Sequence, residues 1–174
     1  MEAPRYNIGQ TLAFTPEAIG VPGKRAFRLV VEASHGAAVL WLEKEQLYGL
    51  ALTIQRLAAA RRLPSSATWE IDEGDLPEPA YDKPEVEFKI GKLVLGYRKD
   101  EDAFVFSVFD AEELGEEEER PVVMFAASRE QLAALAKDSI SVCWAGRPVC
   151  PLCHTAIESP QHICAQFNGH NLKQ

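Results

Sequence analysis

The residues best suited to chemistry in this sequence are thiols and imidazoles near its C-terminus, namely Cys150, Cys153, His162 and Cys164. A zinc ion in a protein prefers four tetrahedral ligands drawn from thiolate sulfur and imidazole nitrogen. The first two thiols can reach one ion, because Pro151 between them pre-sets the backbone of a tight turn. In an extended segment, side chains two positions apart project to the same side, so His162 and Cys164 can share that ion. We therefore predict a zinc site formed by these four residues.

The composition of this ligand set leaves two alternatives. His154 or His170 could bind zinc in place of His162. The first two thiols could instead form a disulfide, but the N-terminal sequence has no apolar signal segment, and a reducing compartment disfavours disulfides. Three thiolates and one imidazole complete the coordination of zinc, whereas a catalytic zinc keeps one position for water. We therefore expect a structural zinc, whose binding drives the folding of the tail.

The overall composition is that of a folded protein with an acidic surface. The chain has 174 residues, 47% of them hydrophobic, and a formal net charge of −8. This length suits one domain with a small appendage, and this hydrophobic content can fill a core. A negative net charge disfavours general binding to nucleic acid, whose phosphates require a basic surface. No apolar run is long enough to span a membrane, so we expect a cytoplasmic protein.

The chain divides into a body, residues 1–145, and a tail, residues 146–174. The body has two halves, about 1–62 and 84–145, joined by a proline-rich and acidic linker at residues 63–83. Apolar runs, several of them alternating with polar residues, predict six strands. The predicted strands are residues 6–14, 25–33, 37–42, 86–98, 103–109 and 121–126.

A helical pattern ends each half. In residues 43–62, apolar side chains recur at intervals of three and four residues, namely Leu47, Leu50, Ala51, Ile54, Leu57 and Ala58. The second helix begins at a capping box, in which the Ser128 side chain bonds the backbone of Gln131 and the Gln131 side chain bonds back. The side chains that this second helix should bury are Leu132, Leu135, Ala136, Ile140 and Cys143.

The two halves share the order strand, strand, strand, helix. Residues 6–12 resemble residues 88–94, and residues 42–47 resemble residues 127–132. We therefore predict an α+β fold made of two βββα units related as an internal repeat. Turns of hairpin length favour antiparallel pairing, so the body should have six mostly antiparallel strands and two helices, each helix covering a sheet face. The zinc knuckle of the tail should lie beside the second helix.

Several of these segments together resemble a known family. Residues 146–153 and 162–164 are similar to the end of DUF3090, a bacterial family of unknown function. Residues 20–27 resemble the start of that family, and residues 88–96 resemble its middle. The resemblance covers nearly the whole chain and implies a cytoplasmic protein of unknown activity. His154 departs from the family pattern, which often has a small residue after the second cysteine.

A non-enzymatic adaptor is the function that the sequence favours. The chain has no Gly-rich phosphate loop, no nucleophile elbow and no His-Glu-x-x-His helix. We therefore assign no catalytic residue and leave enzymatic activity open. In this reading, the closed zinc site shapes a surface that binds another protein.

Two other functions remain open. A cleft between the two halves could bind a small molecule, although the residues that might line it more often pack or form turns. Those residues are His35, Trp41, Tyr48 and Asp82. The knuckle could also contact single-stranded nucleic acid, which the acidity of the chain disfavours. The basic and aromatic residues near it are Arg147, His154, Phe167 and Lys173.

Overall fold

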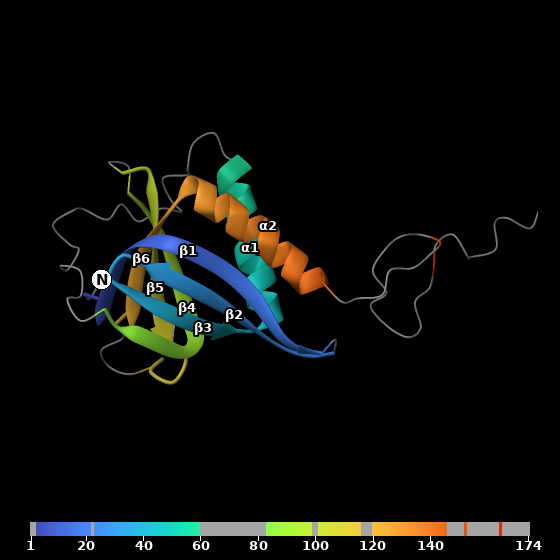
Figure 1. Cartoon of the computed structure of the whole chain (residues 1–174), viewed down its shortest axis with the longest axis horizontal. Coiled ribbons are helices and arrows are strands. Elements are labelled where there is room, and N and C mark those ends of the chain that lie inside the picture. Colours follow the sequence, from blue (N-terminus) through green and yellow to red (C-terminus); the bar gives the residue numbers. More distant parts are fainter. Residues whose placement is uncertain are drawn as a thin grey trace, which may run out of the picture.

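Six strands and two helices form the body of the protein (Figure 1). The computed structural model describes residues 3–21, 23–59, 83–98, 101–115, 120–145, 152 and 164. In chain order the elements are β1 (Tyr6–Val21), β2 (Lys24–Ala33), β3 (Gly36–Leu42), α1 (Lys44–Ala59), β4 (Glu85–Arg98), β5 (Ala103–Asp110), β6 (Val123–Ser128) and α2 (Arg129–Trp144). Neither of the helices described is long and apolar enough to cross a bilayer.

The strands join edge to edge into one closed barrel in the order β1-β2-β3-β4-β5-β6. Neighbours in sequence within each group of three strands pair antiparallel, as the short turns between them predict. The two pairings that link the groups, β3 with β4 and β1 with β6, are parallel. The prediction of a mostly antiparallel six-stranded α+β fold is therefore confirmed. Closure into a barrel replaces the separate helix-covered sheets that the sequence suggested.

The first strand is longer than the sequence predicted. It continues past Phe14, because β1 and β2 stay paired up to Val21 and Lys24. The pairing of β1 with β6 stops at Gln10, so the later part of β1 pairs with β2 alone. Pro16 lies in this part, where a strand with one unpaired edge tolerates a residue without an N–H.

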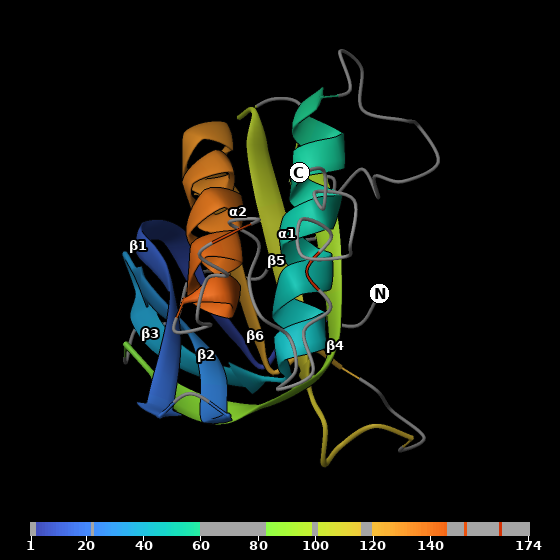
Figure 2. The same cartoon turned by 90° about the vertical axis from the view of Figure 1, so that its right-hand side faces the viewer.

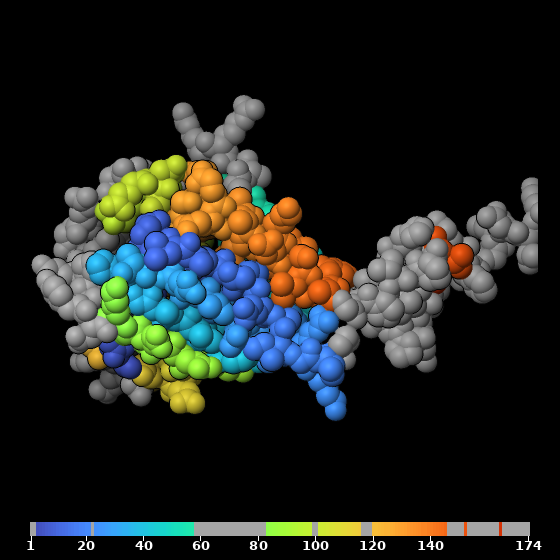
Figure 3. Space-filling model, in the orientation of Figure 1, coloured from blue at the N-terminus to red at the C-terminus, as the bar shows by residue number. Residues whose placement is uncertain are grey.

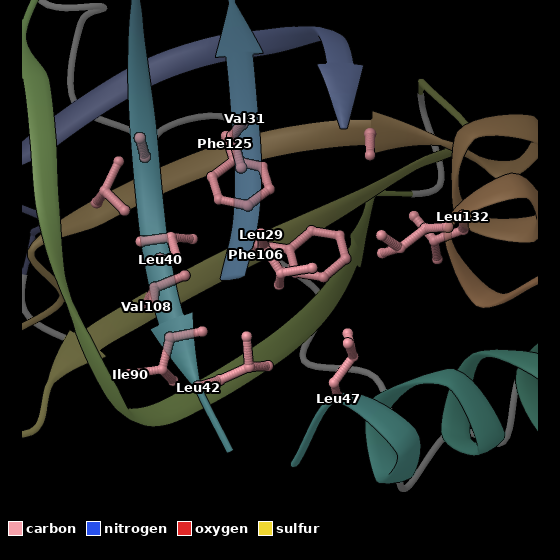
Figure 4. Close-up of a cluster of buried hydrophobic side chains, with 14 of the residues drawn as sticks. Leu29, Val31, Leu40, Leu42, Leu47, Ile90, Phe106, Val108, Phe125 and Leu132 are labelled. Atoms are coloured by element: carbon pink, nitrogen blue, oxygen red, sulfur yellow. The ribbon is translucent and has the colours of Figure 1, made fainter. Parts of the chain in front are cut away.

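Alternation along the strands places one set of side chains inside the barrel. On β2, Phe27, Leu29 and Val31 are buried, while the residues between them are partly exposed. Phe106 and Phe125 stack at 5.0 Å between ring centroids, and Phe14 meets both rings edge-on. Figure 4 shows Phe106 and Phe125 among the buried side chains, with Leu47 of α1 and Leu132 of α2 pointing toward them. The barrel core is therefore continuous with the core under the helices.

The two helices lie side by side against the barrel (Figure 2). Among the described side chains in the periodic pattern of α1, Leu47, Ala51 and Ile54 are buried, whereas Leu50 and Leu57 are only partly buried. The buried side chains of α2 are Leu132, Leu135, Ala136, Ser139 and Cys143, whereas Ile140 is only partly buried. Helix α2 packs on β1 and β6, and α1 packs on α2 and β2.

The predicted capping box at the start of α2 is present. The Gln131 N–H donates to Ser128 Oγ at 3.2 Å, and the Ser128 N–H donates to Gln131 Oε1 at 2.8 Å. The same side chain also reaches β1, where its Nε2 donates to the carbonyl of Thr11 at 2.9 Å. In return the Thr11 hydroxyl donates to Gln131 Oε1 at 2.8 Å. Thus Gln131 both caps α2 and attaches that helix to the barrel.

Candidate functional site

Most of the predicted zinc ligands lie outside the described residues. This holds for Cys150, Cys153 and His162, and for the rival ligands His154 and His170. The fourth ligand, Cys164, is described and is buried. Over the residues that the structure describes, no group of three or more His, Cys, Asp or Glu side chains could hold a metal ion. The zinc site therefore stays a prediction.

Of the residues proposed to line a cleft between the halves, the three that the structure describes each take part in a different contact. His35 lies in the turn after β2, where its backbone N–H donates to the carbonyl of Ile8 on β1. Trp41 follows the buried Leu40 on β3 and donates its indole N–H to Glu87 at 2.7 Å. Tyr48 on α1 meets the ring of Trp144 edge-on at 6.3 Å. Asp82, the remaining candidate, lies outside the described residues. Those described belong to separate structural contacts.

A hollow of about 560 Å³ lies between α1 and the middle of β4, and we call it the α1–β4 groove. Its helical wall is Gln46, Leu50 and Thr53, whose spacing of four and three residues puts them on one face of α1. Leu42 and Ile90 are its buried members. The rest of its wall comes from Gly91 and residues 93–95 of β4. Figure 2 shows α1 running beside this strand.

A bulge shapes the strand side of the groove. The register of β4 against β5 shifts between Ile90 and Lys92, so Gly91 is the extra residue. A Cβ atom at Gly91 would lie 2.4 Å from Leu114 Cδ1 and 2.7 Å from Ala111 Cα. The segment after β5 therefore presses on the bulge, and only glycine leaves it room there.

The lining of the groove suits binding by contact and hydrogen bonding. Among the described residues that line it, only Gln46 and Thr53 have polar side chains, and none is titratable. The Thr53 hydroxyl donates to the carbonyl of Gly49 at 2.9 Å, so its oxygen remains an acceptor. Gln46 Oε1 accepts from the Glu43 N–H at 2.8 Å. These groups can orient a ligand, but they are poor acids, bases and metal ligands at neutral pH.

A cluster of hydrogen-bonded polar side chains lies elsewhere, at the turn between β4 and β5. Asp102 accepts hydrogen bonds from the Tyr97 hydroxyl at 2.6 Å and from Arg129 at 2.8 Å. The bond from Arg129 is the main reason that the pKa of Asp102 is lowered, and the bond to Asp102 is the main reason that the pKa of Tyr97 is raised. The Arg129 guanidinium also lies 5.5 Å above the Phe104 ring. This cluster fastens the turn to the first residue of α2.

An exposed apolar surface lies at the other end of α2. Ile19 and Val21 near the end of β1 are 42% and 64% exposed, and Trp144 in the last turn of α2 is 40% exposed. Arg25 of β2 donates to the carbonyl of Ala145, which holds the hairpin beside the helix end. We call these three apolar side chains the hairpin patch. Figure 3 shows the blue hairpin projecting from the body below the orange end of α2.

The groove was missed by the sequence interpretation. Leu93 and Leu95 resemble ordinary core positions of a strand, but both are only partly buried. Gln46 has the pattern of an exposed helix residue and is exposed in the structure. The one local signal is Gly91 inside an apolar strand, which is typical of a bulge or a close backbone approach. The hollow itself depends on the position of α1 relative to β4, and local sequence patterns do not predict that position.

Comparisons with known proteins show the family of this chain and nothing finer. No curated protein and no solved structure matches it. A family model described as a protein of unknown function (DUF3090) matches residues 6–164. The match begins at the first residue of β1 and includes both helices, so it covers the whole barrel. The resemblance seen in the sequence is confirmed, and the chain belongs to the DUF3090 family of proteins of unknown function.

Proposed function

We propose that the protein is a non-enzymatic binding protein and that its barrel receives a small, mainly apolar molecule in the α1–β4 groove. The observation that carries this proposal is the groove itself. Its volume of about 560 Å³ falls within the range of about 300–1,000 Å³ that is usual for ligand sites. Ligand sites are typically apolar with a few polar groups that fix orientation, and Gln46 and Thr53 supply such groups here.

Binding of the uncharged dye Nile red, followed by its fluorescence in apolar surroundings, tests this proposal. The informative variant is Leu93→Glu, which puts a charge into the partly exposed wall of the groove. The matched control is Leu12→Glu, because Leu12 is 71% exposed on β1, away from the groove. We expect the groove variant to weaken dye binding at least tenfold and the control to bind like the native protein. Equal binding by both variants, or no binding by the native protein, would contradict the proposal.

We also propose that Cys150, Cys153, His162 and Cys164 hold one structural zinc ion in the tail. The ligand types and spacing support this, as does the burial of Cys164 at 7% exposure. Cys150→Ser should lose the metal, while Cys143→Ala should keep it, since Cys143 lies in α2 against the backbone of Lys44. Elemental analysis of protein purified without chelators measures this. Native protein without zinc, or zinc retained after the serine substitution, would refute it.

A second candidate function is binding of another protein in the cytoplasm, as an adaptor would. It is favoured by the hairpin patch, since exposed apolar side chains grouped at one place often mark an interaction site. Val21→Asp should weaken the capture of a specific partner from the native cells, whereas Leu12→Asp should not. Equal recovery of the partner by both variants would argue against this surface.

We further infer that the two βββα units arose by duplication of one unit. The shared order of elements supports this, as does the pair of parallel contacts that joins the units on both sides. The glutamines at the third helical position, Gln46 in α1 and Gln131 in α2, are a further correspondence. A solved structure in which the two units superpose poorly over their strands would count against duplication.

A further inference from the structure

The barrel is made of two four-stranded sheets that share β1 and β4. In one of them, the later part of β1 pairs with β2, β2 with β3, and β3 with the start of β4. In the other, the start of β1 and the end of β4 pair with β6 and β5. The core side of the first sheet carries buried residues such as Leu29, Val31 and Leu40, so the side chains between them point outward. Figure 3 shows this outer side, where the strands from β1 in blue to β4 in green lie uncovered by either helix.

Three rows of outward side chains cross the four strands of this sheet. Residues that pair with one another across neighbouring strands stand in the same row. The first row is Ala13, Glu32, Ala37 and Glu85, the second is Thr15, Val30, Val39 and Glu87, and the third is Glu17, Arg28, Trp41 and Lys89. We call these three rows the open sheet face.

The centre of the open sheet face is apolar. Where one side of an antiparallel sheet faces solvent, its outward residues are usually polar. The two central strands, β2 and β3, instead present Val30, Val39 and Trp41, which are only partly buried. Apolar side chains grouped on an outer surface often mark an interaction site. The composition of this face therefore indicates a contact with another molecule.

The rows on either side of the centre carry opposite charges. On β2 the first row has Glu32 and the third row has Arg28. On β4 the first row has Glu85 and the third row has Lys89. Both cations make partly exposed ion pairs within the chain, at 2.7 Å in each case. Such exposed pairs contribute little stability, so the same two cations can also meet an acid of a second molecule.

We propose that a second copy of this chain covers the open sheet face, with a twofold axis along the second row. Half a turn about this axis places the first row of one copy opposite the third row of the other. Acid then meets base on β2 and on β4, while on β3 the small Ala37 meets the large Trp41. Val30 and Val39 meet their own counterparts on the axis. The face is therefore complementary to itself in charge and in size, which favours a second copy over an unrelated partner.

The geometry of stacked sheets preserves these contacts. Aligned sheets pack at about 30° to each other, which moves the outer rows sideways by about 3 Å, less than the strand spacing of about 4.8 Å. At ordinary strand dimensions the face is about 19 Å wide and about 20 Å long, which is at the small end of specific interfaces. We therefore expect a weak dimer, with a Kd of about 10–100 μM. This inference goes beyond the proposed binding functions and does not depend on them.

One position of the face opposes the dimer. Glu87 lies on the axis at the β4 end of the second row, so it meets its own counterpart as a like charge. Its carboxylate accepts a hydrogen bond from the indole of Trp41 at 2.7 Å, and the oxygen of an amide can accept the same bond. Glu87→Gln should therefore strengthen the dimer about two- to fivefold.

Sedimentation equilibrium of the full-length protein, with a reducing agent to exclude disulfides between tails, tests the proposal. The native protein should approach twice the mass of one chain above about 100 μM. Val39→Glu puts like charges into the apolar centre and should weaken the dimer at least about tenfold. The control is Ala134→Glu, which adds the same charge at an exposed position of α2 and should leave association unchanged.

Two charge variants test the orientation of the two copies. Glu85→Lys alone brings lysines together on β4, and Lys89→Glu alone brings glutamates together there. Each variant should therefore weaken its own dimer about three- to tenfold. An equimolar mixture of the two restores opposite charges at both contacts, so the mixture should associate as the native protein does.

Several outcomes would overturn the proposal. A native protein that stays monomeric at about 1 mM would do so, as would equal association of the Val39→Glu and Ala134→Glu variants. A mixture of the charge variants that associates no better than each variant alone would refute the twofold arrangement, and so would a weaker dimer in Glu87→Gln. Far-UV circular dichroism of each variant checks that the barrel is intact.

Discussion

Replacing Gln131 by methionine should destabilise the protein several times more than the same replacement at Gln46. Both residues occupy the third position of a helix, and both accept a hydrogen bond from the N-cap backbone. Gln131 alone continues to the barrel, through two further bonds with Thr11. The two substitutions therefore differ mainly in the attachment of a helix to a strand.

The size of the effect follows from these bonds. Gln131→Met removes two bonds with Thr11 and one with the Ser128 N–H. At about 1 kcal/mol for each net hydrogen bond, the loss is about 3 kcal/mol. The substitution also leaves the buried Thr11 hydroxyl without its acceptor. This unsatisfied group adds its own cost, so about 3 kcal/mol does not overestimate the loss of stability. Gln46→Met removes one bond at an exposed site and should cost about 0.5–1 kcal/mol.

Urea denaturation followed by far-UV circular dichroism measures both losses, with the dependence on urea expected to be unchanged. In thermal unfolding, about 3 kcal/mol corresponds to a drop of about 6–12 °C in a chain of this size, and the Gln46 variant should drop by less than about 4 °C. Equal losses in the two variants would refute the reasoning, because they would show that the bonds with Thr11 add no stability.

Two further predictions concern the turn between β4 and β5 and two glycines, Gly91 in the wall of the groove and Gly49 on α1. The pKa of Asp102 is lowered in the folded state, chiefly by the hydrogen bond from Arg129. Ionised Asp102 therefore stabilises the fold at pH values above its unfolded pKa of about 3.9. This contribution disappears as the pH falls through the folded pKa. Asp102→Asn should therefore lower the urea midpoint slightly at pH 7, and the difference should disappear as the pH falls through the folded pKa of Asp102. Gly91→Ala should cost about 1–3 kcal/mol because its Cβ meets Ala111, while Gly49→Ala on α1 meets nothing within 4 Å and should stabilise by up to about 1 kcal/mol. A destabilised Gly49 variant, or an unchanged Gly91 variant, would contradict this in the same urea experiment.

Local patterns in the sequence were sufficient for the elements of the fold. The alternation of Phe27, Leu29 and Val31 gave the faces of β2, and the spacing of Leu47 and Ile54 gave the buried face of α1. These local patterns could not predict which strands pair when the strands lie far apart in the chain. The parallel contacts of β3 with β4 and of β1 with β6 join residues far apart in the chain, and they turn two groups of strands into one barrel.

The capping box shows what local sequence patterns can predict and what they cannot. The pair Ser128 and Gln131 was predicted correctly, because its spacing is local. The bonds from Gln131 to Thr11 could not be predicted, since β1 lies far from α2 in sequence. The groove is the converse case, because Leu93 and Leu95 have the pattern of core residues but are only partly buried beside the hollow between α1 and β4. The predicted zinc ligands apart from Cys164 fall outside the described residues and await elemental analysis.

The pairing of β1 with β6 affects how the protein folds while it is being synthesised. Strand β1 is synthesised before β6, so it finds one of its two partners only after β6 has been made. Until then the free edges of β1 and β3 offer unpaired backbone groups to other nascent chains. Ring closure between such distant segments is also entropically slow. Protection of the early half during translation, by a chaperone or by rapid docking of α1, should therefore decide how much of this protein a cell recovers.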